Sequence, residues 1–145
     1  MKEKKHSVLV ILCSFNRKNK TIRCLSQIYD IFSKLDILFE VVLVDDASTD
    51  GTPNEAESSF NELKLIKTDG GLFWAGSMRY GFEAAWNDSY DSLLVINDDV
   101  CLIENRVKNF FNNSLKIKDF KNNKTSIILV GSMKSNEIDN KLSYG

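Results

Sequence analysis

Four short, uninterrupted apolar runs constrain the fold of this chain more than any other feature of its sequence. Each is rich in Val, Ile and Leu, and they cover residues 8–13, 39–44, 93–96 and 127–130. A fifth run, residues 63–67, is weaker. Apolar character that is continuous rather than alternating is typical of strands buried on both faces, as in a parallel sheet. We therefore interpret the runs as strands of a mainly parallel sheet.

Helical signals lie between these runs. Apolar residues recur at three- and four-residue spacing from Ile22 to Phe32, which predicts a helix with one face against the sheet. The string Thr52-Pro53-Asn54-Glu55 is typical of a capping box with proline in the first turn, so a second helix should begin there. Two further helices are expected over residues 76–87 and 104–111. Strand alternating with helix predicts an α/β fold, a parallel sheet flanked by helices.

Length and composition indicate an ordinary globular protein. The chain has 145 residues, of which 43% are hydrophobic and 27% charged. It contains one proline, and its sequence shows no Gly/Ser-rich linker or internal repeat, so we expect residues 1–145 to form a single domain. The 19 Lys and Arg residues nearly balance 20 Asp and Glu residues, and the net charge of −1 excludes a strongly basic nucleic-acid-binding protein.

The sequence favours a cytoplasmic location over export or membrane insertion. Cys13, Cys24 and Cys101 cannot all pair with one another and lack the spacing of a metal knuckle, so we expect reduced thiols. The apolar run behind the charged N-terminus is too short for a signal sequence or a spanning helix. Peripheral association with the inner face of a membrane stays open.

The polar residues that follow the predicted strands are candidates for a site, because ligands of open parallel sheets bind outside the carboxyl ends of the strands. These residues are Cys13-Ser14-Phe15-Asn16-Arg17, then Asp45-Asp46-Ala47-Ser48-Thr49-Asp50-Gly51, and then Asn97-Asp98-Asp99. Two pairs of adjacent carboxylates on one rim repel each other unless a cation neutralises them. Mg²⁺ or Mn²⁺, held by one or two carboxylates and the phosphates of a substrate, would do so. The alternative is that these residues form turns and cap the following helices.

A glycine-rich segment, residues 68–79, supplies a second component. Gly70, Gly71 and Gly76 allow close backbone approach, and a helix that begins near Gly76 can direct free N–H groups at an anion. Arg79, one turn into that helix, could reach a diphosphate. The alternative is a flexible turn whose aromatic residues pack into the core, with Arg79 solvated at the surface.

These segments resemble the inverting nucleotide-sugar glycosyltransferases of family two, which have the GT-A fold. The resemblance is carried by residues 7–17, 42–52 and 97–99, and the string Val-Asp-Asp-Ala-Ser-Thr-Asp-Gly-Thr at 44–52 is its most specific part. The segment Gly71 to Gly76 is similar to one in the rhamnosyltransferase-like branch. The resemblance implies a Rossmann-like half that binds a nucleoside diphosphate sugar, linked to UDP, dTDP or GDP, for transfer of the sugar to an acceptor hydroxyl.

The resemblance also implies roles for individual residues. Cys13 and Ser14 would lie beside the nucleobase. Asp46 would accept a hydrogen bond from the base, and Asp45 would shape the same pocket. The candidate donor site as a whole consists of Cys13, Ser14, Asn16, Arg17, Asp45, Asp46, Gly71, Gly76, Arg79, Asn97 and Asp98.

The metal ligands implied by the resemblance are Asp98 and Asp99, which match the acidic motif of the family. Asp99 would contact the divalent cation directly, and Asp98 would also lie near the ribose or the donor sugar. The cation would neutralise charge that grows on the departing diphosphate. Asn97 stands where many members carry an acid or a small residue, so we expect a lower metal affinity.

No residue is assigned as the catalytic base, because the family usually supplies it as a carboxylate later in the chain. We therefore interpret residues 1–145 as the donor-binding half of a transferase whose acceptor half is absent. The acceptor would be a glycan or a lipid-linked molecule of cell-surface polysaccharide or glycan synthesis. Two alternatives stay open: a nucleotide-sugar-binding fragment without turnover, and a phospho-receiver signalling domain. In a receiver the paired acids follow the first strand, whereas here they follow the second.

Overall fold

The computed structural model describes residues 5–114, 132–134 and 142–144. The chain divides into two compact units, residues 1–102 and 103–145. The first unit contains β1 (His6–Ser14), α1 (Lys18–Phe32), β2 (Ile37–Asp45), α2 (Thr52–Ser59), β3 (Lys64–Lys67), α3 (Phe73–Ala85) and β4 (Ser92–Val95). The second contains α4 (Glu104–Ser114) and an antiparallel pair, β5 (Ser132–Lys134) and β6 (Leu142–Tyr144).

A parallel sheet with the strand order β3-β2-β1-β4 forms the centre of the first unit. β1 and β2 pair along their full lengths, from His6 opposite Ile37 to Ser14 opposite Asp45. β4 pairs with the other side of β1, and β3 pairs with β2. The parallel sheet and its strands over four of the five apolar runs are thus confirmed. The run at residues 127–130 lies outside the described residues.

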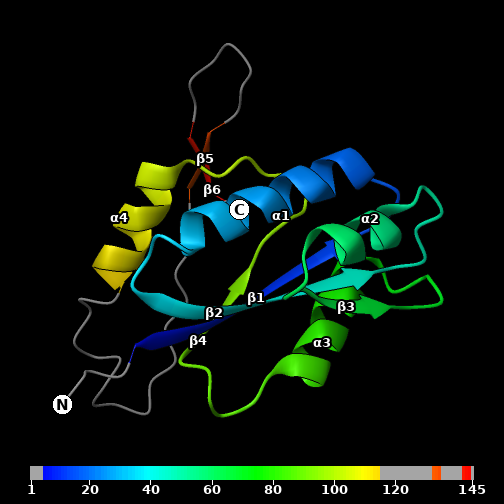
Figure 1. Cartoon of the computed structure of the whole chain (residues 1–145), viewed down its shortest axis with the longest axis horizontal. Helices are drawn as coiled ribbons and strands as arrows, with labels where there is room; N and C mark the ends of the chain where they lie inside the picture. The colour runs from blue at the N-terminus through cyan, green and yellow to red at the C-terminus, as the bar shows by residue number, and fades with distance from the viewer. Residues whose placement is uncertain (1–4, 115–131, 135–141, 145) are drawn as a thin grey trace. The chain divides into compact units, whose positions relative to one another are not determined.

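The two central strands are buried on both faces, which explains their continuous apolar sequence. Leu9 and Ile11 of β1 pack with Met78 and Ala85 of α3 on one face of the sheet. On the other face, Phe32 of α1 meets the β2 side chain Phe39 with their ring centroids 5.6 Å apart. Figure 1 shows α1 and α2 on one side of the sheet and α3 on the other. The predicted α/β fold with helices on both faces is confirmed.

Helix α2 begins where predicted, but the capping-box interpretation is wrong. The N-cap residue is Gly51, in the left-handed region at φ 84, and it makes no side-chain cap. The Thr52 hydroxyl instead donates to the carboxylate of Asp50, which also accepts the Thr52 N–H. A charged acceptor two residues away is the stronger partner, so the threonine closes a local turn rather than capping the helix.

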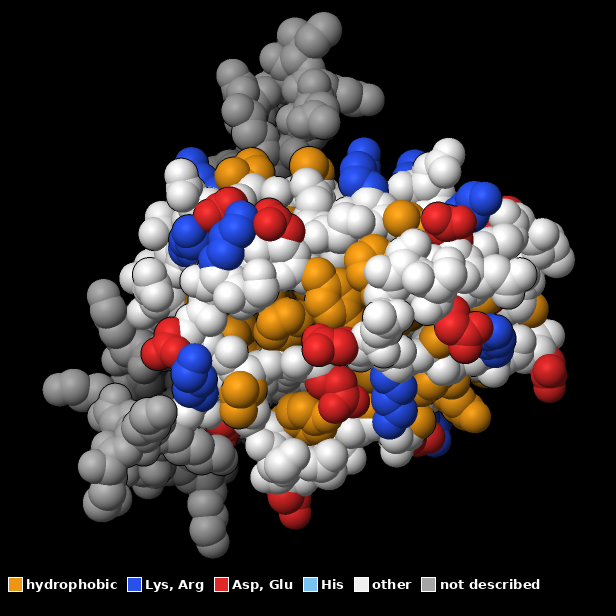
Figure 2. Space-filling model, viewed as in Figure 1, with side chains coloured by type: hydrophobic (Ala, Val, Ile, Leu, Met, Phe, Trp, Pro, Cys, Tyr) orange, Lys and Arg blue, Asp and Glu red, His pale blue; other side chains and the backbone are white. Residues whose placement is uncertain are grey.

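Helix α3 begins at Phe73, earlier than the predicted start near residue 76. Helix α4 begins at Glu104 as predicted and continues to Ser114. Within the described part of the chain, no helix has both the length and the apolar character needed to cross a membrane. On the face seen in Figure 2, acidic and basic side chains are interspersed, in keeping with the net charge of −1.

Candidate functional site

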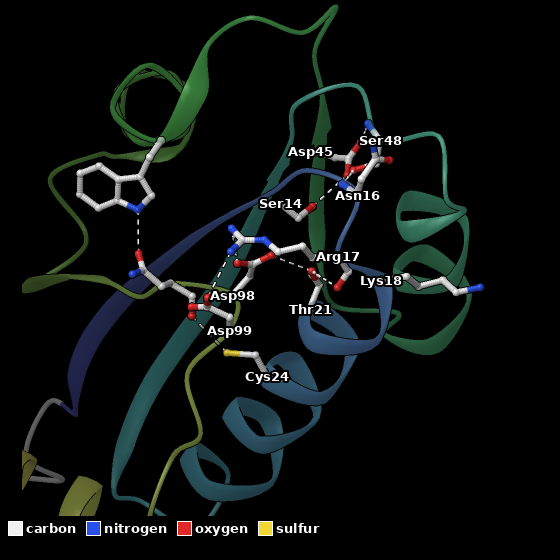
Figure 3. A network of polar contacts seen from close by, with 12 residues as sticks. Ser14, Asn16, Arg17, Lys18, Thr21, Cys24, Asp45, Ser48, Asp98 and Asp99 are labelled. Carbon is white, nitrogen blue, oxygen red and sulfur yellow. Dashed lines mark hydrogen bonds and ion pairs between the residues drawn. The ribbon is translucent and has the colours of Figure 1, made fainter. Parts of the chain in front are cut away.

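The carboxyl ends of β1 and β2 carry a buried pair of polar side chains. Ser14 and Asp45 stand opposite each other as the last pair of the two strands, and each is 2% exposed. The Ser14 hydroxyl donates to Asp45 Oδ2 at 2.8 Å, and the Ser48 N–H donates to Asp45 Oδ1 at 2.9 Å. Figure 3 shows these three residues together at the strand ends. Asp45 therefore holds the start of the loop after β2.

Asn16 ties the loop after β1 to the loop after β2. Its backbone lies in the left-handed region, at φ 51, which asparagine tolerates better than most residues. Its N–H donates to Ser48 Oγ at 2.9 Å, and its side-chain oxygen accepts the Thr49 N–H at 2.8 Å. The two loops that frame the rim are thus cross-linked through Asn16.

The acidic pair that follows β4 faces the first turn of α1. Asp98 is fully buried, and the Thr21 hydroxyl donates to its Oδ2 at 2.9 Å. Arg17 Nη2 lies 2.8 Å from Asp98 Oδ1, and Arg17 Nη1 lies 3.2 Å from Asp99 Oδ2. One guanidinium thus bridges both carboxylates (Figure 3). Burial raises the pKa of Asp98 above its ordinary value, against the lowering effect of the Thr21 hydrogen bond and the Arg17 charge.

The donor set at this acidic pair fits a cation that is shared with a substrate. Asp98 Oδ1 is a buried oxygen without a hydrogen bond among the described residues, and it faces the positive charge of Arg17. Asp99 is partly exposed beside it. The described ranges contain no group of three or more His, Cys, Asp or Glu side chains that could hold a metal. Two carboxylates completed by phosphate oxygens are a common arrangement for Mg²⁺.

Asp46 anchors the loop that precedes α3. Its carboxylate accepts hydrogen bonds from Thr68 Oγ1 at 2.7 Å and from the N–H groups of Leu72 and Phe73, each at 3.0 Å. Burial raises the pKa of Asp46, but its hydrogen bonds lower the pKa by more. The pKa of Asp46 therefore lies below its ordinary value. A carboxylate is a favourable partner for the first N–H groups of a helix, which explains the early start of α3.

The expectation that a helix starts near Gly76 with its N–H groups free is therefore wrong, because α3 starts at Phe73. Gly76 lies inside α3, and its N–H donates to the carbonyl oxygen of Leu72. At the actual start of the helix, the N–H groups of Leu72 and Phe73 donate to Asp46. Gly70 and Gly71 have φ values of 93 and 83, so the turn ahead of α3 requires glycine at these positions.

Trp74 connects α3 to the acidic motif, a link that sequence reasoning missed. Its indole Nε1–H donates to the side-chain oxygen of Asn97 at 2.8 Å. Trp74 is 52% exposed and Phe73 is 80% exposed, so the alternative of aromatic residues packed into the core is wrong for this turn. The amide oxygen of Asn97 thus holds the tryptophan against the residue that precedes the two carboxylates in sequence.

Cys13 and Arg79 take contrasting positions. Cys13 is buried at the end of β1, and burial, with the nearby charge of Asp98, raises the pKa of its thiol to about 11. Arg79 is solvent-exposed and pairs with Glu83 of its own helix at 2.8 Å. Cys13 is therefore an uncharged part of the rim, and Arg79 forms a surface ion pair.

Thiol labelling with iodoacetamide at neutral pH should modify Cys101 quickly and Cys13 and Cys24 slowly. Cys101 is exposed, whereas burial raises the pKa of Cys13 to about 11 and that of Cys24 to about 12, which suppresses the reactive thiolate. Mass spectrometry of peptides from the native and urea-unfolded protein measures this. Equal labelling rates for Cys13 and Cys101 in the native protein would contradict the buried position of Cys13.

The fold and this rim define a class: a parallel α/β domain with paired carboxylates at the carboxyl ends of its strands, the edge where ligands of such sheets bind. Residues 9–137 match the model of glycosyl transferase family 2, and the chain belongs to that family. A comparison with curated proteins gave no match.

Solved structures share the fold. The mannosyltransferase PcManGT from Pyrobaculum calidifontis, in complex with GDP-Man and Mn²⁺, is 25% identical, with a TM-score of 0.60 over 74% of this chain and 32% of that one. TarS 1–349 from S. aureus, in complex with UDP-GlcNAc, is 21% identical, with a TM-score of 0.57 over 73% of this chain and 30% of that one. This chain therefore spans about a third of the length of these structures.

Proposed function

We propose that this chain binds the nucleoside diphosphate sugar of an inverting glycosyltransferase at the rim formed by the ends of β1, β2 and β4. The observation that carries the proposal is the buried Asp98 beside the half-exposed Asp99, with Arg17 at both. Family membership and the donor complexes of two structures with this fold support it.

The diphosphate is proposed to lie at the acidic pair. Asp99, and with it Asp98, would hold Mg²⁺ or Mn²⁺, a Lewis acid that offsets the charge of the leaving diphosphate. The carboxylate of Asp98 is already oriented by Thr21, so it need not reorganise when a ligand arrives. Arg17 would add a donor that suits phosphate oxygens.

The nucleobase is proposed to lie beside Cys13 and Ser14. Asp46 would accept a hydrogen bond from the base. The N–H and O–H donors of Thr68, Leu72 and Phe73 already contact both carboxylate oxygens of Asp46. A base N–H would therefore share one of these oxygens with them, within the about four acceptor sites that a carboxylate offers.

The transfer step itself requires a base that removes the proton of the acceptor hydroxyl on the face opposite the leaving group. We propose a glycan or lipid-linked acceptor in cell-surface polysaccharide or glycan synthesis, as in the rhamnosyltransferase-like branch. Because the chain spans about a third of the similar structures, donor binding without turnover is the second candidate for these residues.

Titration calorimetry of the 145-residue chain with UDP, dTDP and GDP, with and without Mn²⁺, tests donor binding. We expect one nucleotide to bind in the presence of Mn²⁺ and Asp99→Ala to weaken it by about tenfold or more, since a cation loses a direct ligand. Asp88→Ala, at an exposed carboxylate on the loop before β4, is the matched control and should bind normally. Nucleotide binding that is absent, or that does not depend on the metal, would overturn the proposal.

A further inference from the structure

We propose that Arg17 is an exchangeable counter-cation: it holds the Asp98–Asp99 pair without a metal, yields these carboxylates to a divalent cation, and then turns to the diphosphate. This inference rests on the proposed function, because it concerns the order of events at the same site. Arg17 would thus have two successive partners, first the two carboxylates and then the diphosphate, rather than a single role in binding the nucleotide sugar.

The geometry of the ion pair favours exchange. A guanidinium binds most strongly when two parallel N–H groups meet the two oxygens of one carboxylate. Here the two terminal nitrogens are divided between two carboxylates, at 2.8 Å from Asp98 Oδ1 and 3.2 Å from Asp99 Oδ2. The buried oxygen of Asp98 gains the charge of Arg17 but no hydrogen bond among the described residues. The ion pair therefore neutralises charge but lacks the two parallel hydrogen bonds of a bidentate arginine–carboxylate pair.

A divalent cation and the guanidinium would compete for the same two carboxylates. Arg17 contacts Asp98 Oδ1 and Asp99 Oδ2, and the side chains of Asp98 and Asp99 are also the ones that would hold a hard cation. Two carboxylates and one guanidinium carry a net charge of −1, and a divalent cation between the carboxylates would repel an Arg17 side chain that stayed in place. Entry of the cation thus requires the guanidinium to leave.

The surroundings of Arg17 allow its side chain to move while the site keeps its shape. The side chain is 40% exposed. Its carbonyl oxygen accepts the N–H groups of Lys20 and Thr21 at 2.9 and 3.0 Å, which fixes the backbone at the start of α1. The Thr21 hydroxyl independently holds Asp98 Oδ2 at 2.9 Å. After the exchange, Asp98 keeps its position and the released guanidinium can bind two phosphate oxygens.

Binding of Mn²⁺ alone, followed by electron paramagnetic resonance on the full chain, tests the exchange. We expect Arg17→Gln to bind Mn²⁺ about tenfold more tightly than the wild type, because a competing charge is gone. At saturating Mn²⁺, the same variant should bind the preferred nucleoside diphosphate about tenfold more weakly. Arg23→Gln, at an exposed arginine of α1, is the matched control and should change neither affinity.

Arg17→Met provides a second uncharged variant if the glutamine variant does not fold. It also removes the positive charge that competes with the cation, so it should likewise bind Mn²⁺ more tightly than the wild type. Unchanged or weaker Mn²⁺ affinity in a folded Arg17 variant would overturn the inference. Failure of the wild type to bind any nucleotide would instead refute the proposed function, while the measurement with Mn²⁺ alone still decides the exchange.

Discussion

Replacing Asp46 with alanine is expected to lower the free energy of unfolding by about 2–4 kcal/mol. This is less than the sum of three hydrogen bonds to a charged group, worth about 1.5–3 kcal/mol each, because water partly solvates the freed donors. The Thr68 hydroxyl and the N–H groups of Leu72 and Phe73 all lose their acceptor at once. Asp46 is 7% exposed, so water cannot fully replace it. Urea denaturation of the variant and the wild type measures the loss.

Thr68→Val is the matched control, because it removes only the Thr68 hydroxyl, one of the three donors, and leaves the Asp46 carboxylate in place. It should cost about 1 kcal/mol, clearly less than Asp46→Ala. Asp46→Ala should also move the turn ahead of α3 and weaken nucleotide binding. If its unfolding midpoint equals that of the wild type, Asp46 does not anchor this turn.

The contribution of Asp46 to stability should depend on pH in a defined direction. Its pKa in the folded protein lies below its ordinary value, because its hydrogen bonds outweigh the effect of burial. A group with a depressed folded pKa stabilises the protein above its unfolded pKa of about 3.9, and the stabilisation is lost as the pH falls through the folded pKa. The stability difference between wild type and Asp46→Asn should therefore be largest at neutral pH and shrink below about pH 4. A difference that grows on acidification would contradict this sign.

Gly81→Val should destabilise the protein by about 3 kcal/mol or more, at the upper end of overpacking costs. A Cβ at Gly81 would lie 2.8 Å from Val44 Cγ2 and 3.0 Å from Ile11 Cγ2, closer than side chains pack. Both neighbours are β-branched and fully buried in the central strands, so they have little freedom to move away. Helix α3 would have to lift from the sheet.

The control for this substitution is Ala75→Val, at an exposed position of the same helix. It introduces the same β-branched side chain without a clash, so it should cost well below 1 kcal/mol, from helix propensity. Thermal unfolding followed by circular dichroism compares the two variants. Equal melting temperatures for Gly81→Val and Ala75→Val would show that α3 does not pack closely on the sheet.

The strands were predictable because burial on both faces leaves a local signature, the unbroken apolar run. The helix with residues Ile22 to Phe32 was predictable because one buried face repeats at helical spacing. The start of α3 was not predictable in the same way. It depends on Asp46, whose hydrogen bonds to Leu72 and Phe73 join residues far apart in the sequence.

The candidate site shows the same limit. Its carboxylates could be predicted from their place after strands, since the topology of a parallel sheet brings strand ends together. Thr21 and Trp74 were missed as partners of Asp98 and Asn97, because a threonine on a helix and an exposed tryptophan carry no local sign of such contacts. The sequence alone does not distinguish a diphosphate-binding Arg79 from a surface arginine, and in the structure Arg79 forms a surface ion pair with Glu83.

The unbroken register of β1 and β2 limits how this chain tolerates insertions and deletions. Ser14 and Asp45 meet because both strands reach the rim after the same number of residues. One residue added within β2 would turn every side chain beyond it to the opposite face of the sheet. Two added residues would restore the faces but carry Asp45 about 6–7 Å past Ser14, at about 3.3 Å per residue. Changes of length should therefore be accepted in the loops but not in these two strands.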